Sequence, residues 1–116
     1  MIELSAEAQR LLADLAAAHE ALIGRTDAGE AERRAFRAIS EVMEAGMAGV
    51  SDADLARSPS PEEWSMAEVV EHVAEHDRQY VELIGQGLRH YIEHGLEHAI
   101  QLWHMRPNGG IADVLE

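Results

Sequence analysis

Apolar residues recur at every third or fourth position through almost the whole chain, and this spacing restricts what the chain can fold into. An amphipathic α-helix has this period, whereas a half-buried strand needs a strict alternation that the sequence does not show. The spacing predicts helices over residues 5–23, 28–50, 65–84 and 88–105, followed by a tail at 107–116. Amphipathic helices with short connections favour an antiparallel four-helix bundle, so we expect an all-α fold.

Capping residues mark the expected helix starts. Ser5 precedes the first helix, and Gly24 follows it where a glycine commonly ends a helix. Asp27 is a start signal for the second helix. Ser65 and Glu68 have the spacing of a capping box, in which each side chain bonds the other residue's backbone N–H. These signals agree with the limits that the apolar period predicts.

The segment 51–61 is polar and contains Pro59 and Pro61, so we expect it to be the longest connection in the fold. Leu55 lies in its middle and is expected to anchor it to the core. Trp64 is expected to be a second core anchor, just before the third helix.

Size and composition limit the organisation of the chain. With 116 residues, of which 47% are hydrophobic, the chain is expected to form one domain over 1–116. It has no apolar run near the roughly 20 residues that span a bilayer, and its first residues lack the pattern of a secretory signal. We therefore expect a soluble, cytoplasmic protein.

Charge and cysteine content exclude several classes of function. The net charge is −13, and the 9 basic residues are all arginine, which argues against nucleic acid or a membrane surface as a partner. The chain has no cysteine, so disulfides and thiolate ligands are excluded. Any metal site has to use imidazole and carboxylate groups.

Histidines are concentrated in the last two expected helices. If the chain reverses at Gln86, residues equidistant from it lie at the same height, so His72 faces position 100 and His76 faces position 96. His72 and His98 then differ in height by roughly 3 Å, at about 1.5 Å rise per residue. His94 and His98 are four residues apart and share a helix face, as two imidazoles that bind one ion do. The spacing alone leaves both a metal site and a plain helical bundle open.

The other histidines have different expected positions. His76 is either a spare ligand or outer-shell partner of such an ion, or a partly exposed polar residue. His90 lies one turn before His94 and turns about 40 degrees away from its face, so we expect it to be solvated. His19 and His104 are expected at the surface.

Few other side chains are candidates for chemistry. Glu75 or Asp77 could act as a general base or a fourth ligand, but their spacing selects neither. Tyr80 and Tyr91 fall on apolar faces, and we expect both to pack in the core. No catalytic residue is therefore assigned from the sequence.

Two motifs resemble those of a known family. The segment 64–72, with the sequence WSMAEVVEH, resembles the helix start of the DinB/YfiT-like superfamily, in which a histidine follows the tryptophan by eight residues. The segment 94–101, HGLEHAIQ, is similar to that family's later His-x-x-x-His helix, where a glutamine commonly follows. The resemblance covers about residues 30–105.

The resemblance implies a metalloprotein. It assigns His72, His94 and His98 as the ligands of a divalent ion, with zinc or nickel as the expected metal. Three neutral imidazoles leave coordination positions open for a small-molecule substrate or a thiol. The family includes thiol-dependent transferases, so a metal-dependent enzyme of the thiol-dependent transferase or small hydrolase type is implied, with an exogenous low-molecular-weight thiol as a possible cofactor.

The chain departs from the family between the two motifs. Only the 21 residues 73–93 separate His72 from His94, whereas family members have a further helix and a long connection there. This predicts a compact, rearranged version of the fold, with the first helix in the vacant place.

Two alternatives stay open. The residues from Gly85 to Gly87 either form a turn, which allows a site within one chain, or continue as a single rod. In a rod, His72 and His94 lie roughly 33 Å apart along the axis, and only a dimer could assemble the site. A homodimer is expected in both geometries. A non-catalytic dimerisation or sensing module, with a structural or vestigial histidine site, is the alternative function.

Overall fold

The computed structural model describes residues 3–26, 28–79 and 88–106 of the chain. It contains the helices α1 (Ala6–Gly24), α2 (Glu30–Met47), α3 (Asp52–Leu55), α4 (Met66–Gln79) and α5 (Leu88–His104). These residues include no strand, so the expectation of an all-α fold is confirmed. None of the described helices combines the length and the apolar character needed to cross a bilayer.

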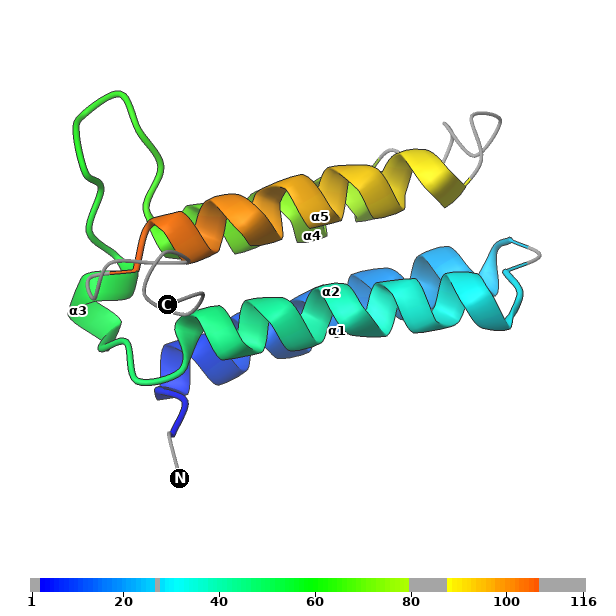
Figure 1. Ribbon diagram of the computed structural model, residues 1–116, viewed down its shortest axis with the longest axis horizontal. Coiled ribbons are helices and arrows are strands. Elements are labelled where there is room, and N and C mark those ends of the chain that lie inside the picture. The colour runs from blue at the N-terminus through cyan, green and yellow to red at the C-terminus, as the bar shows by residue number, and fades with distance from the viewer. Residues whose placement is uncertain (1–2, 27, 80–87, 107–116) are drawn as a thin grey trace, which may run out of the picture.

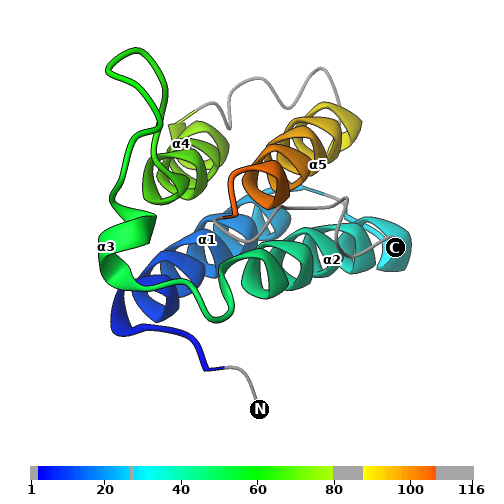
Figure 2. The ribbon, with the colours of Figure 1, turned by 60° about the vertical axis from the view of Figure 1, so that its left-hand side comes forward.

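The long helices lie in two layers, one formed by α1 and α2 and the other by α4 and α5 (Figure 1). The two helices of each layer run antiparallel. Between the layers, the most extensive packing joins α1 to α4 and α2 to α5 (Figure 2). The short helix α3 lies at one end, against α1 and α4.

Two of the expected capping residues begin helices. The hydroxyl of Ser5 accepts a hydrogen bond from the backbone N–H of Ala8 at 3.1 Å. Ser65 and Glu68 form the reciprocal capping box, with distances of 3.2 Å and 3.0 Å. These bonds satisfy backbone donors that have no partner within the helix. The expected cap Asp27 lies outside the described residues.

The second helix is shorter than the expected range of 28–50, because α2 begins at Glu30 and ends at Met47. Gly49 has a φ of 78°. This left-handed conformation is open to glycine at little cost and cannot continue a right-handed helix. The prediction of the helix end was therefore wrong, because the apolar period continues to the buried Val50 after the backbone has left the helix.

Residues at the end of α5 bind the end of α2. The indole N–H of Trp103 donates to the carbonyl of Val42 at 2.9 Å. The Arg106 guanidinium donates to the carbonyls of Ala45 and Gly46, at 2.8 Å and 2.9 Å. The carbonyls of Ala45 and Gly46 belong to the last turn of the helix, where carbonyls lack partners within the helix, so these bonds hold the two helix ends together.

The helices α4 and α5 pack side by side within the one chain. A single rod across both is therefore excluded. The expected turn at Gly85–Gly87, residues 80–84 of the third expected helix, and the tail at 107–116 lie outside the described residues, as does Tyr80.

The core lies between the two layers, and α3 contributes to it. Leu55 is fully buried, which confirms its predicted role as an anchor, although the sequence analysis did not predict a helix there. At Gly95 the backbone of α5 lies close to α2, since a Cβ at this position would be only 2.9 Å from Cδ1 of Ile39. Large side chains without exposure come from every helix: Leu11, Leu15, Leu22, Phe36, Ile39, Met43, Met47, Leu55, Met66, Val69, Tyr91 and Leu102.

Candidate metal centre

The three histidines that the resemblance assigned as ligands lie together between α4 and α5. One ring nitrogen each from His72, His94 and His98 falls within 4.8 Å of the others. The Nε2 atoms of His72 and His94 are 3.2 Å apart. The ring of His98 lies 4.8 Å from that of His72 and 4.6 Å from that of His94. Residues distant in the sequence thus form one cluster of nitrogen donors.

The register of α4 against α5 differs from the one expected for a reversal at Gln86. His76 was expected to lie level with position 96, but its ring is 4.1 Å from that of His94 and 5.4 Å from that of His90. Each α4 histidine therefore sits about one helical turn further towards the start of α5 than expected. The expected register assumed that the connection between α4 and α5 alone determines which of their residues lie at the same height. The close packing of α5 on α2 at Gly95 also constrains the position of α5.

Gln101 orients the ring of His98. The Nδ1 atom of His98 lies 2.7 Å from Oε1 of Gln101, so the ring donates Nδ1–H to the amide oxygen. A neutral imidazole with the proton on Nδ1 has its lone pair on Nε2. This is the arrangement in which metal-binding histidines are usually held by an outer-shell acceptor. From the sequence, Gln101 was noted only as part of the His-x-x-x-His motif, and no role in orienting His98 was predicted for it.

His94 lies deepest in the cluster. Its pKa is lowered from 6.5 to about 4, first by burial and then by three neighbouring imidazoles. Burial also lowers the pKa of His72, with the nearby His98 as the next cause. Both rings are therefore neutral near pH 7, which is the form that binds metal. The Nδ1 atom of His94 is buried and has no hydrogen-bond partner among the described residues.

Trp64 covers one side of the cluster. Its ring lies 4.5 Å from that of His72 and 6.1 Å from that of His98, and the residue is 41% exposed. The expectation that Trp64 is a core anchor was wrong, because the residue precedes the helix cap and packs on the imidazoles instead. An open pocket of about 420 Å³ lies beside Trp64 and Gln101, although none of the three histidines lines it.

A second group of polar side chains lies behind the cluster, around the fully buried carboxylate of Asp77. Its Oδ2 lies 3.1 Å from Nε2 of His19, and its Oδ1 lies 3.0 Å from Nδ1 of His76. A ring nitrogen of His94 is within 4.8 Å of the ligand atoms of His76 and Asp77. The carboxylate therefore joins α1 to α4 directly beneath the histidines.

His19 contradicts the expectation of a surface position, because it is only 4% exposed. A signal for this was present: His19 follows Leu15 by four residues and precedes Leu22 by three, so it lies on the buried stripe of α1. Because histidine is polar, it was not counted among the apolar residues from which the buried positions were predicted. A buried imidazole needs a partner, and Asp77 provides it.

The remaining histidines differ in burial. His76 has a side chain that is 13% exposed, and its contact with Asp77 places it behind the cluster. His90 is half-buried against Tyr91, with ring centroids 5.3 Å apart, so it is only partly solvated. His104 is exposed, and Tyr91 is fully buried, as expected.

No protein-family model matches the chain, and neither a curated protein nor a solved structure shows detectable similarity to it. A functional interpretation has to rest on the chemistry of the clustered histidines.

Proposed function

We propose that His72, His94 and His98 bind one divalent metal ion within a DinB/YfiT-like four-helix bundle. The observation that carries this proposal is the 3.2 Å between Nε2 of His72 and Nε2 of His94. Two nitrogens bound to a tetrahedral zinc ion at about 2.0–2.1 Å lie about 3.3–3.4 Å apart. The two rings therefore need little movement to share an ion. The contact between His98 and Gln101 supports the proposal, because it leaves Nε2 of His98 free to bind the same ion.

The donor set favours zinc or nickel. Imidazole suits both ions, and the chain has no cysteine to favour softer metals. Three protein ligands leave at least one coordination position for another molecule, as in catalytic rather than structural sites. All three histidines are partly exposed, so that position is accessible to solvent.

A metal-dependent enzyme of the thiol-dependent transferase or small hydrolase type fits this site best. A bound divalent ion lowers the pKa of a thiol or a water molecule and polarises an adjacent oxygen. The neighbouring pocket of about 420 Å³, which Gln101 and Trp64 line but the three histidines do not, has room for a small substrate or a low-molecular-weight thiol. We expect the protein to work as a homodimer.

Elemental analysis of untagged protein, purified without chelator, tests the proposal. We expect about one zinc or nickel ion per chain, and loss of that ion in His94→Ala. The matched control is His104→Ala, because His104 is an exposed histidine at the end of the same helix. Protein that binds no ion after incubation with zinc or nickel, or a His94→Ala variant that binds as well as the original, would sink the proposal. Measurement of the solution mass in the same samples tests the homodimer.

A non-catalytic sensing or dimerisation module is the second candidate, and one observation favours it. Asp77 was a candidate general base, but it has no exposure and already contacts both His19 and His76. It cannot reach a substrate in the pocket. Zinc that changes the solution mass, without thiol transfer or ester hydrolysis by the loaded protein, would favour the module over the enzyme.

A further inference from the structure

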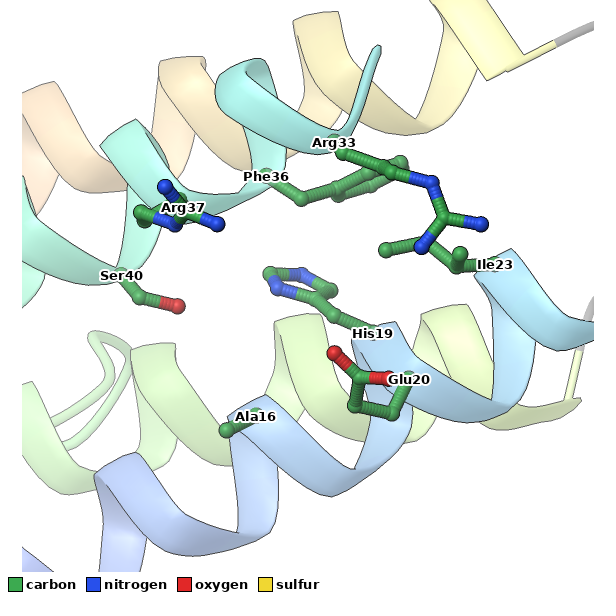
Figure 3. Close-up of a pocket in the computed structure, with 8 residues that line it drawn as sticks. All are labelled: Ala16, His19, Glu20, Ile23, Arg33, Phe36, Arg37 and Ser40. Atoms are coloured by element: carbon green, nitrogen blue, oxygen red, sulfur yellow. The ribbon is translucent and has the colours of Figure 1, made fainter. Parts of the chain in front are cut away.

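A pocket of about 250 Å³ lies between α1 and α2, and Figure 3 shows its lining. None of its residues belongs to the histidine triad, so it is a separate feature of the molecule. The buried His19 is among the lining residues, and its ring packs against that of Phe36 with centroids 4.8 Å apart. Arg33, Arg37 and Ser40 line it from α2, while Ala16, Glu20 and Ile23 line it from α1.

The two arginines of this pocket are one helical turn apart on α2 and are both exposed. In the part of the chain that the structure describes, neither forms an ion pair with a carboxylate. Other arginines do form such pairs: Arg10, Arg34, Arg57, Arg78 and Arg89. In a chain with 22 acidic residues, two guanidinium groups at one pocket, one towards each end of it in Figure 3, thus have no carboxylate partner among the described residues.

We propose that this pocket binds a small organic carboxylate. A guanidinium presents parallel N–H donors that match the two oxygens of a carboxylate, and it loses less hydration than an ammonium group when it does so. The exposed side chains of Arg33 and Arg37 turn towards one another over the pocket to contact the carboxylate, and the apolar part of the ligand lies against Phe36 and Ile23. The hydroxyl of Ser40 offers one further hydrogen bond at the same wall.

Charge and size select the ligand class. Glu20 is the acidic residue of the lining and lies on the α1 side, opposite the arginines (Figure 3). Two guanidinium groups, one carboxylate of the protein and one monoanion give a neutral site, whereas a phosphate dianion leaves excess negative charge. The volume lies below the roughly 300–1,000 Å³ of drug-sized sites, so the ligand is small.

Titration of the protein as purified, followed by amide NMR, tests this site with sodium benzoate and inorganic phosphate as probes. We expect benzoate to shift the resonances of Ala16 and Ser40, and to bind at least tenfold more weakly to the Arg33→Gln/Arg37→Gln double variant. The control is Arg34→Gln, which changes the intervening arginine that pairs with Glu30 at 3.7 Å. That variant should bind benzoate like the original protein.

Three results would overturn the proposal: no benzoate binding by the original protein, equal binding by the double variant, or tighter binding of phosphate than of benzoate. All three substituted side chains are exposed, so the variants are expected to fold. Since the pocket shares no ligand with the triad, failure to bind metal would leave this proposal standing.

Discussion

Nε2 of His72 lies 3.2 Å from Nε2 of His94, although 22 positions separate the two residues in the chain. At this distance one nitrogen donates and the other accepts, so the neutral rings hold different tautomers. An ion bound by both nitrogens needs a lone pair on each. Metal binding would therefore require one proton to move to the far side of a ring, where an acceptor would have to receive it.

His98 already has an acceptor of this kind, because its Nδ1 lies 2.7 Å from Oε1 of Gln101. The Gln101→Leu variant removes the oxygen that fixes the ring, and loss of an outer-shell partner typically weakens metal binding about 10–100-fold. The Gln101→Glu variant keeps an acceptor and should retain the affinity. Competition for zinc with a chromophoric chelator measures both variants. Equal affinities for Gln101→Leu and the original protein would show that this contact does not position His98.

Acid should destabilise the metal-free protein below the ordinary histidine pKa of 6.5. The folded state holds His94 at a pKa of about 4, so between these values the unfolded state binds more protons. Stability thus rises with pH from about 4 to 6.5, and is fully present above 6.5. Urea denaturation midpoints across this range measure the slope. The His94→Asn variant should have a shallower slope, and an unchanged slope would contradict the assignment.

Substitution of Asp77 by asparagine should destabilise the fold and weaken metal binding. The amide cannot accept from both His19 and His76, and a buried polar group without its partner costs about 1–3 kcal/mol. The control is Asp14→Asn, which breaks the surface pair with Arg78. Such exposed pairs contribute at most about 1 kcal/mol. Chemical denaturation gives both values, and Asp77→Asn costing no more than Asp14→Asn would contradict the role of the buried carboxylate.

Gly95→Ala should be destabilising, because its Cβ would lie 2.9 Å from Cδ1 of Ile39. Overpacking of this kind costs about 1–3 kcal/mol. Ile39→Val removes the Cδ1 atom, so the double variant should recover part of that loss. Gly24→Ala is the matched control, since no atom lies within 4 Å of a Cβ there. Thermal unfolding measures the series, and additive effects of the Gly95 and Ile39 substitutions would disprove the close contact.

The helices and the histidine cluster follow from local patterns, and this is why the sequence could predict them. The capping box of Ser65 and Glu68 depends on neighbouring residues alone. His94 and His98 share a face because of helical geometry, and His72 meets them once two helices pack antiparallel. The sequence could therefore identify these candidate residues without knowing the detailed packing.

Features that depend on packing between distant segments were missed. His19 is buried because Asp77 on another helix offers it a partner, and no spacing rule joins positions 58 apart. Trp64 lies outside the core and packs on the imidazole of His72 instead, a contact between side chains that sequence spacing does not reveal. The register of α4 against α5 also differed, since contacts of α5 with α2 take part in fixing it.

The three candidate ligands lie on two helices of one layer, α4 and α5, but α4 packs mainly on α1 and α5 mainly on α2, so each helix belongs to a different pair across the layers. An ion held between them would cross-link the two helix pairs. In the unfolded chain such a link would close a loop of about 22 residues, and the entropy lost there corresponds to about 3 kcal/mol if the link behaves like a disulfide. The chain has no cysteine and therefore no disulfide, so the ion would serve as a removable cross-link. The stability of the folded protein would then depend on the metal concentration.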